Sequence, residues 1–399
     1  MAKTKSKPMN QGLGAAKVAK KDEFYTQYVD IQKEVEAYLE FDLDAFRGKI
    51  VYCNCDDPFE SNFFKYFAAN FNRLGLKKLI STSYDGSPVA GVQLTLDEYN
   101  RTNGKRQKPK AIAIEIEEVK DLNGDGATDI EDVRLFLEQN PHHRTNLAEG
   151  GDFRSSECVE LLKQADIVVT NPPFSLFREY VALLVRHKKK LLIIGNTNSI
   201  TYKEIFPLIK ANKLWLGCTN FNVGMFFEVP DDWENFHHID EQTGKKIARV
   251  STSCWYTNID HGRRHEPLSL MTMADNLRYS KNLKGKSAYD RYDNYDAIEI
   301  GFYKDIPSDY DGIMGVPITF INKYNPDQFE IVGTTESNDP DNPFRTRVYT
   351  SKECRDAYQK RFGKSGVYDL NASGVVNGVK VFKRVLIRRC CRTVQGKKL

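Results

Sequence analysis

The sequence of 399 residues lacks any long apolar run, and this absence limits where the protein can act. A membrane-spanning helix needs about 20 consecutive apolar residues, and no stretch approaches that length. The lysine-rich start also has no apolar core of the kind found in a secretory signal peptide. We therefore expect a cytoplasmic protein with no membrane partner.

The eight cysteines lack the spacing of a zinc site, because no Cys-x2-Cys pair is present and no paired histidines complete one. Reduced thiols are expected. Internal repeats are absent too. With 40% hydrophobic and 28% charged residues the composition is that of a globular protein. The length exceeds that of one ordinary core, which predicts a catalytic domain and a second module.

The net charge of +4 is modest, but the basic residues gather at the two ends. Basic ends commonly contact phosphates, and the alternative is that they are solvated tails. Residues 1–21 have little to bury and are expected to form a flexible basic arm. The basic residues at the two ends are Lys3, Lys5, Lys7, Lys17, Lys20 and Lys21, then Lys380, Lys383, Arg384, Arg388, Arg389, Arg392, Lys397 and Lys398.

A short β-branched run, Ile167 to Thr170, leads into Asn171-Pro172-Pro173-Phe174. The two prolines cannot extend a strand, so the strand must stop there. Buried apolar strands of this kind are typical of central parallel strands, and ligands bind beyond the carboxyl ends of such strands. Asn171 is therefore predicted to lie at a site.

The chemistry of this tetrapeptide suits a flat amine. The Asn171 side-chain oxygen and the Pro172 carbonyl can both accept hydrogens from an exocyclic NH2 group. Phe174 offers a face for stacking a heteroaromatic ring, worth roughly 1–3 kcal/mol. The alternative interpretation is a strand end with a rigid turn.

The tetrapeptide resembles motif IV of the amino-methyltransferases. That resemblance implies transfer of a methyl group from S-adenosylmethionine (SAM) to the N6 of adenine, the N4 of cytosine or the amide of a glutamine. Asn171, Pro172, Pro173 and Phe174 are then the candidate catalytic residues.

A first core strand at residues 49–53 is followed by a polar turn and a helix predicted from Ser61 to Arg73. The turn lacks the Gly-x-Gly that a dinucleotide phosphate needs, and it carries Asn54 and Asp56 instead. Carboxylates and amides side by side suit the charged groups of SAM. The alternative is a capped turn at a helix start.

Further candidates for the cofactor site lie elsewhere. Ser83 ends a second strand at residues 77–83. Beyond the end of this strand a Rossmann-like sheet holds a ribose, usually with an acid, and Asp85 is either that acid or part of an Asp-Gly turn. Tyr25 and Thr26 belong to a Phe-Tyr-Thr run that resembles motif X of DNA methyltransferases. Asp152 occupies the position at which motif III of the methyltransferases places an acid, and its alternative role is a carboxylate at a helix start.

Helices and strands alternate from residue 28 to about 229, which predicts an α/β fold with a Rossmann-like, doubly wound methyltransferase sheet. The expected domains are a SAM-dependent methyltransferase domain at residues 22–229, with an insertion at 86–150, and an irregular α+β target-recognition module at 230–399. Expected elements of the second module are strands at 253–257, 297–300 and 379–387 and a helix at 352–362.

The insertion contains Asp121, Asn123, Asp125 and Asp132 at positions that match a calcium loop. Position 8 is Thr rather than an apolar residue, and position 12 is Asp rather than the Glu of an EF-hand. The sequence therefore leaves two interpretations open, a structural calcium site or a turn that caps a helix.

Several longer runs resemble the EcoRI-type N6-adenine methyltransferases of restriction-modification systems. The likeness covers roughly residues 22–330 and implies methylation of a flipped-out adenine in double-stranded DNA by a monomer that needs no metal. It also implies a cognate restriction endonuclease that shares only the recognition site, and Phe226 or Phe227 as a second stacking residue. The matching runs are DEFYTQY, VYCNCDDP, SNFFKYFA, GLKKLI, GDFRSSE, DIVVTNPPFSLFREY, NSITYKE, YDNYDAI and MGVPITF.

Three other functions stay open at this point. The chain could methylate an RNA base or a protein glutamine, or it could be a DNA-binding protein that kept the fold without turnover. The calcium-like loop also allows a calcium-dependent assembly module.

Overall fold

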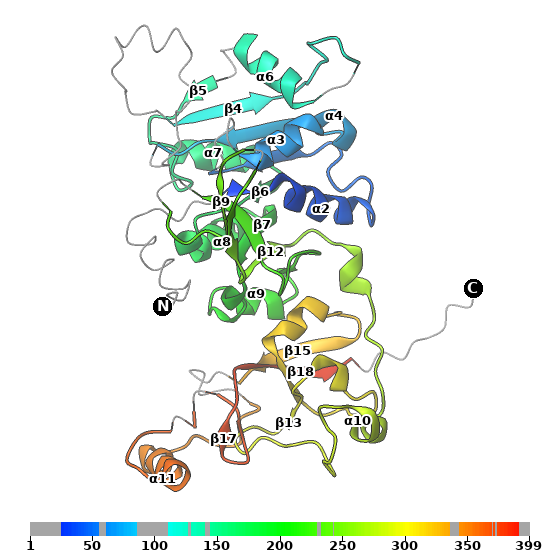
Figure 1. Cartoon of the computed structure of the whole chain (residues 1–399), viewed down its shortest axis with the longest axis vertical. Coiled ribbons are helices and arrows are strands. Elements are labelled where there is room, and N and C mark those ends of the chain that lie inside the picture. The colour runs from blue at the N-terminus through cyan, green and yellow to red at the C-terminus, as the bar shows by residue number, and fades with distance from the viewer. Residues whose placement is uncertain are drawn as a thin grey trace, which may run out of the picture. The chain divides into compact units, whose positions relative to one another are not determined.

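The chain forms two compact units (Figure 1). The first comprises Met1–Pro207 with Leu214–Gly262, and the second comprises Leu208–Lys213 with Arg263–Leu399. In the part of the chain that the structure describes, no helix is long and apolar enough to cross a membrane. The computed structural model describes residues 25–55, 61–85, 111–126, 129–139, 144–229, 233–335 except 242, and 343–390 except 369 and 372.

An eight-stranded sheet lies at the centre of the first unit, with strand order β5-β4-β3-β2-β6-β7-β12-β8. The four middle strands run parallel, and the outer strands pair antiparallel. The predicted mixture of helices and strands is confirmed. The bounds are β2 Ile50–Cys53, β3 Lys78–Thr82, β4 Ile112–Ile116, β5 Arg144–Asn146, β6 Ile167–Thr170, β7 Lys190–Asn196, β8 Trp215–Leu216 and β12 Ser253–Thr257.

The path of the chain through this sheet reverses direction between β2 and β6. From β2 the chain continues to β3 on one side, whereas β6 lies on the other side of β2 and continues to β7. In open α/β sheets a crevice opens at the carboxyl ends of the strands where the order reverses. The residues that follow β2 and β6 therefore occupy the position expected for a ligand site.

Helices α3, α7 and α8 pack against strands β3, β2 and β7. The helix predicted from Ser61 to Arg73 is divided at Asn70, whose side-chain amide donates to the Tyr66 carbonyl at 2.8 Å. The helices of this unit are α2 Tyr28–Leu39, α3 Asn62–Ala69, α4 Phe71–Leu74, α6 Ile130–Gln139, α7 Ser156–Gln164, α8 Phe177–Arg186 and α9 Phe206–Lys210, of which the last continues into the second unit. Among the described residues the 3-10 helices are η2 Phe174–Leu176, η3 Thr197–Thr201, η4 Gly262–His265, η5 Tyr303–Asp305 and η6 Ile318–Lys323.

A second sheet of the first unit has the order β1-β9-β11-β10. Alternate residues Met225, Phe227 and Val229 of β9 are buried in the same core as the large sheet. This one-sided burial is typical of antiparallel sheets, and it explains why β9 does not extend the large sheet. The bounds are β1 Tyr25–Thr26, β9 Met225–Val229, β10 His238–Ile239 and β11 Lys246–Val250.

The first compact unit extends beyond residue 229, where the sequence places the domain boundary. Strand β12, expected in the second module, pairs with β7 and β8 in the large sheet. All five of its residues are buried, and Trp255 lies in the core of the first unit. The unit therefore ends at Gly262, because burial of β12 outweighs the change in composition after Pro230.

The second unit contains a four-stranded sheet with the order β13-β14-β18-β15 and a small β16-β17 ribbon. Helix α11 is the predicted helix, and the Thr350 side chain and Glu353 form a capping box at its start. The bounds are α10 Met273–Tyr279, α11 Ser351–Phe362, β13 Ile298–Glu299, β14 Met314–Pro317, β15 Phe329–Thr334, β16 Val375–Val376, β17 Val379–Lys380 and β18 Arg384–Arg389.

Three arginines of the basic C-terminal end form ion pairs within the second unit. Arg384 pairs with Glu299 at 2.6 Å, and both side chains are largely buried. The other two contacts are Arg388 to Glu330 at 2.6 Å and Arg389 to Asp311 at 3.7 Å. The charge of these arginines is therefore partly neutralised by neighbouring acids.

Glu34 on α2 is a fully buried carboxylate that fixes the segment after β8. It accepts the backbone N–H of Cys218 at 2.7 Å and both the N–H and the hydroxyl of Thr219, at 2.8 and 2.5 Å. A Cβ at Gly217 would lie 2.2 Å from the Glu34 oxygen, so glycine is required there. Burial raises the pKa of Glu34, while the hydrogen bonds from Thr219 and Cys218 act in the opposite direction.

We expect Glu34→Ala to lower the free energy of unfolding by about 3 kcal/mol, because three donors of Cys218 and Thr219 lose their buried acceptor. Glu36→Ala is the matched control, since Glu36 lies on the same helix and its ion pair with Arg73 is exposed. We expect the control to change stability by less than about 0.5 kcal/mol. Denaturant unfolding measures both values, and equal losses would contradict an anchoring role for Glu34.

Candidate active site

The carboxyl ends of three parallel strands bring predicted site residues together. Asn54 follows β2, Ser83 follows β3 and Asn171 follows β6, and these strands are neighbours in the sheet. The Thr170 hydroxyl donates to the backbone carbonyl of Asn54, which joins the end of β6 to the end of β2. The sequence predicts each of these residues at a strand end, and the sheet places those ends side by side.

The Asn-Pro-Pro-Phe segment lies at the edge of the core, where the Asn171 side-chain oxygen is buried and Phe174 packs against the core cluster. Asn171, Pro173 and Phe174 are half-buried, and Pro172 is buried. The Pro173 carbonyl accepts the Leu176 N–H at 2.9 Å, which starts the 3-10 turn that leads into α8. The two prolines therefore end the strand, as predicted, and hold Asn171 between strand and turn.

Phe174 is supported by an aromatic residue from the second sheet. Its ring lies edge-on to Phe227, with ring centroids 6.3 Å apart. Phe227 is fully buried and pairs directly with Thr26 of β1. Of the two phenylalanines offered by the sequence, Phe227 therefore supports Phe174 from the core, whereas Phe226 contacts His237 and His238.

Strand β1 presents its two residues on opposite faces of the second sheet. Thr26 is buried and lies opposite Phe227, and the Asn62 side chain at the start of α3 donates to its carbonyl at 2.8 Å. Tyr25 lies opposite Glu228 and so points to the other face. The structure thus brings Thr26 toward Phe174 and turns the side chain of Tyr25 away, and the cofactor roles of both remain predictions.

Asn54 belongs to a buried polar network at the ends of β2 and β3. Its side-chain oxygen accepts the Thr82 hydroxyl at 3.1 Å, and Thr82 also bonds the Tyr52 hydroxyl at 3.1 Å. All three residues are 0% exposed. The Asn54 Nδ2 atom is buried and has no hydrogen-bond partner among the described residues.

Ser83 holds the strand next to it rather than pointing freely into a site. Its hydroxyl accepts the Ile112 N–H at 2.9 Å, which secures the start of β4. The Gly150-Gly151 turn packs against this end of β3, and a Cβ at Gly151 would lie 2.0 Å from the Ser83 carbonyl oxygen. Only glycine fits there, and the close approach carries Asp152 to the end of β3.

Asp152 is ionised and bound to Arg154. The guanidinium of Arg154 lies 2.7 Å from one carboxylate oxygen and also contacts Glu179 at 3.1 Å. The hydrogen bond from Arg154 lowers the pKa of Asp152, while partial burial acts in the opposite direction. The Arg154 N–H also bonds this carboxylate at 2.8 Å just before α7, so the helix-start interpretation describes part of its role.

Asp56, another predicted cofactor residue, lies outside the described residues. The calcium-like loop is described except for residues 127 and 128. The Asp132 carboxylate accepts the backbone N–H groups of Leu122, Asn123 and Asp129.

The remaining predicted calcium ligands also bond within the loop. Asp121 accepts the N–H groups of Gly124 at 2.6 Å and Gly126 at 2.8 Å, and the Asn123 amide donates to Asp125 at 3.2 Å. No group of three or more His, Cys, Asp or Glu that could hold a metal ion is found among the described residues. The calcium prediction therefore rests on sequence spacing alone.

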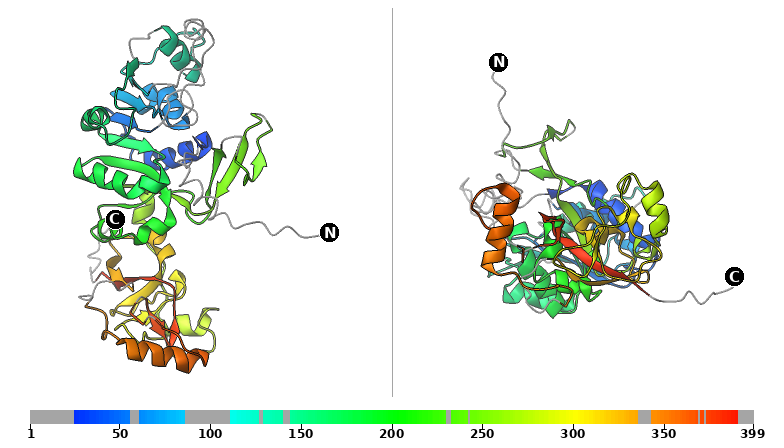
Figure 2. Two further views of the ribbon diagram at one scale, coloured as in Figure 1. Left: turned by 90° about the vertical axis from the view of Figure 1, so that its left-hand side faces the viewer. Right: turned by 90° about the horizontal axis from the view of Figure 1, so that it is seen from below.

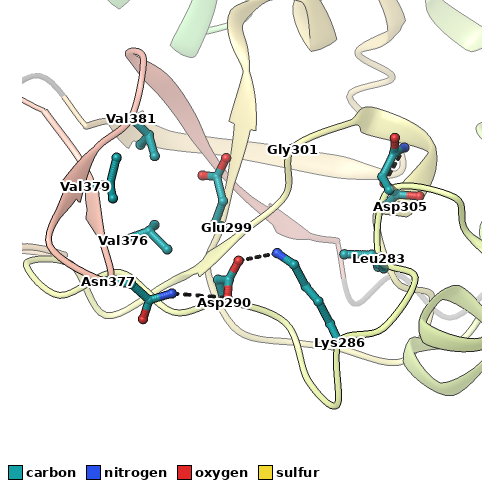
Figure 3. A pocket seen from close by; sticks show the side chains of 11 residues that line it. Leu283, Lys286, Asp290, Glu299, Gly301, Asp305, Val376, Asn377, Val379 and Val381 are labelled. Carbon is teal, nitrogen blue, oxygen red and sulfur yellow. Dashed lines mark hydrogen bonds and ion pairs between the residues drawn. The ribbon is translucent and has the colours of Figure 1, made fainter.

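A cavity of about 390 Å³ lies in the second unit, and none of the residues that line it is a predicted site residue. Val376 of β16, Val379 of β17 and Asn377 between these strands lie on one side, and Lys286 lies on the other (Figure 3). Asp290 contacts both Lys286 and Asn377. Asp305 at its rim accepts the Asn282 amide at 3.0 Å. Each of these polar side chains therefore already has a partner within the protein.

Comparison with known proteins identifies the class of enzyme, an adenine-specific DNA methyltransferase. The family model described as "Adenine-specific methyltransferase EcoRI" matches residues 12–390. The chain belongs to this EcoRI family of adenine-specific methyltransferases, as the sequence resemblance predicts. No solved structure matches the chain.

Curated relatives agree with this family. The chain is 45% identical to Type II methyltransferase M.EcoRI of Escherichia coli over 81% of its length and 89% of the relative. It is 35% identical to Type II methyltransferase M.MgeORF184P of Mycoplasma genitalium, over 94% and 97% of the two chains. It is 38% identical to Type II methyltransferase M.MpnI of Mycoplasma pneumoniae, over 79% and 83%.

The sequence did not single out Thr170 or Thr82 as site residues. Each is the last residue of a buried strand, and each uses its hydroxyl to bond Asn54. A threonine that ends an apolar strand beside a polar turn is a signal that could have indicated both residues.

We expect Gly151→Ala to weaken SAM binding and stability together, because the new Cβ would collide with the Ser83 carbonyl and displace Asp152. Gly48→Ala is the control, since Gly48 also has a positive φ, of +67°, but nothing within 4 Å. The control should lose only the roughly 1–2 kcal/mol of left-handed strain. Unfolding and calorimetric SAM titration test this, and equal behaviour of the two variants would refute the role of the close approach.

Proposed function

We propose that the chain methylates the N6 amine of a flipped-out adenine in duplex DNA, with SAM bound across the carboxyl ends of β2 and β3 and the adenine held at the end of β6. One observation carries this assignment. Asn171 is half-buried at the tip of β6, and the Thr170 hydroxyl bonds the Asn54 carbonyl on the neighbouring strand. This arrangement would hold the adenine, which accepts the methyl group, next to SAM, which donates it.

We interpret the large sheet as a Rossmann-like methyltransferase sheet. The parallel order β3-β2-β6-β7, the reversal between β2 and β6, and helices packed on these strands support this interpretation. The antiparallel strand β12 beside β7 is an addition to a purely parallel doubly wound sheet. The proposed site lies where the order reverses.

The residues at this crevice fit SAM. Asn54 Nδ2 and Thr26 Oγ1 are buried polar atoms with no hydrogen-bond partner among the described residues. A buried donor without an acceptor costs about 1–3 kcal/mol, so a ligand with carboxylate or hydroxyl oxygens would stabilise this region. We propose that the Asp152 carboxylate, which also binds Arg154, accepts from an amine of SAM. When bound, SAM supplies an electrophilic methyl group on a sulfonium.

The base pocket holds and orients the adenine amine. The adenine must leave the helix stack because its N6 is not reachable inside the duplex. Asn171 Oδ1 and the Pro172 carbonyl accept the two N6 hydrogens, and Phe174, braced by Phe227, stacks on the ring. The two acceptors stabilise the positive charge that develops on N6, and positioning supplies much of the rate.

We propose that the second unit and the basic N-terminal residues 1–21 recognise and hold the duplex. The second unit contributes exposed aromatic and basic side chains suited to groove contacts. A monomer acting on double-stranded DNA accounts for these features, and a restriction endonuclease partner would share only the recognition sequence.

We expect the wild-type chain to transfer a tritiated methyl group from SAM to duplex DNA and not to RNA or protein. Asn171→Ala should lower kcat by at least about 100-fold, because an acceptor aimed at the developing charge is lost. Its SAM dissociation constant should stay within about twofold of wild type, and sequencing with modified-base detection should locate the methylated adenines. Methylation of RNA or protein alone would refute the proposal, and loss of SAM binding would move Asn171 out of the base pocket.

A further inference from the structure

The second sheet of the first unit has a free end, and we propose that this end contacts duplex DNA beside the target adenine. We call β9, β11, β10 and the residues between them, 225–229 and 233–250 except 242, the arm. In Figure 2 its strands, in light green, project from the side of the large sheet. The inference rests on the proposed function, because it takes an adenine held at Phe174 as its starting point.

The strand register places Phe227, which contacts Phe174, on the same face of the arm as residues of its other strands. Residues directly opposite each other in antiparallel strands share a face, and alternate residues of one strand do so too. Phe227, which contacts Phe174, therefore shares a face with the residues paired across the sheet. This inner face contains Thr26, Phe227, Val229, Ala248, Lys246 and Ile239.

The inner face is buried at its base and apolar but exposed at its free end. Phe227 and Ala248 are 0% and 3% exposed, whereas Ile239 is 51% exposed. Phe236, just before β10, is 39% exposed, and the Lys246 ammonium lies 5.1 Å from the centre of its ring. Ile239 and Phe236 are thus exposed apolar side chains at the free end of the face whose buried part contains Phe227.

The dimensions of a sheet place this pair close to the substrate. Two residues along a strand and two strand spacings separate Phe227 from Ile239, which corresponds to roughly 12 Å. That distance equals about three to four base steps of 3.4 Å. The Phe174 ring lies a further 6.3 Å from that of Phe227. In our proposal a duplex whose adenine is held at Phe174 extends along this face to Ile239 and Phe236, because apolar side chains of this kind contact unstacked base steps.

The test uses Ile239→Ser and Phe236→Ser, with His238→Ser as matched control. His238 adjoins Ile239 but lies opposite Ile247, so it is on the outer face, and all three side chains are exposed. The probe is a duplex that carries the sequence methylated by the wild type, with 2-aminopurine at the target adenine. We expect the inner-face variants to bind about tenfold more weakly and to reduce the 2-aminopurine signal, with SAM affinity unchanged.

Two results would overturn the inference, namely inner-face variants that bind and flip like the wild type, or a control that weakens binding equally. Either result leaves the proposed function intact as long as the wild type methylates DNA. Absence of methyl transfer to DNA by the wild type would instead refute the proposed function itself.

A separate observation concerns Thr170, which we infer to be a positioning residue for the methyl transfer. The backbone pairing of β2 with β6 extends only over Val51–Ile167 and Tyr52–Val168. Beyond that point the Thr170 hydroxyl bonds the Asn54 carbonyl, so a side chain continues the join between the strands. Asn54 and Thr170 are both 0% exposed, which excludes water as a substitute.

This hydrogen bond connects the two halves of the site. Asn171 follows Thr170 directly, and Asn54 carries the buried donor proposed to face SAM. In-line transfer needs reacting atoms about 3–3.5 Å apart, and a misplacement of about 1 Å can cost 10²-fold in rate. Loss of the hydroxyl should therefore change the rate of the transfer more than the affinity for either ligand.

We expect Thr170→Val to lower kcat by about tenfold or more, with the KM for DNA and the SAM dissociation constant within about threefold of wild type. Thr170→Ser, which keeps the hydroxyl, should restore kcat. Thr257→Val is the control, because Thr257 is equally buried in the same sheet and donates to the Leu191 carbonyl at 2.8 Å. If kcat falls equally in both valine variants, in proportion to lost stability, the positioning role is wrong.

Discussion

The hydrogen bond from the Thr170 hydroxyl to the Asn54 carbonyl is the contact on which the geometry of the site depends. It lies where the parallel ladder of β2 and β6 has ended, at the point at which the strand order reverses. Both residues are excluded from water, so the bond cannot be exchanged for one to solvent. The Asn-Pro-Pro turn is thereby tied to the strand that carries the proposed cofactor donor.

Strand β9 has a second structural role, because it connects elements that are far apart in the sequence. Phe227 pairs with Thr26 at the start of the described chain and supports Phe174 in the middle. The same strand pairs with β11 and so anchors the arm. Alternation along one short strand therefore links the predicted cofactor residue Thr26, the predicted stacking residue Phe174 and the proposed DNA contact.

Many charged side chains bind partners within the protein, although the clustering of basic residues at the end of the sequence suggests that they are free to contact phosphates. Arginines at the C-terminal end bond Glu299, Glu330 and Asp311, and the carboxylates of the calcium-like loop bond backbone amides of the same loop. A linear count of charges records none of these partners. Exposed contacts to DNA must therefore come from a smaller set of residues than the sequence offers.

The sequence by itself determined the strands at β2, β3 and β6, the chemistry of Asn171 to Phe174 and the family, because these depend on local apolar runs, proline geometry and contiguous motifs. Only the tertiary structure decided that β12 belongs to the large sheet, that β9 belongs to the second sheet, and that Tyr25 and Thr26 point to opposite faces. A strand's period reveals which side chains alternate, but its partner is chosen by burial against residues distant in the chain, and no local pattern encodes that choice.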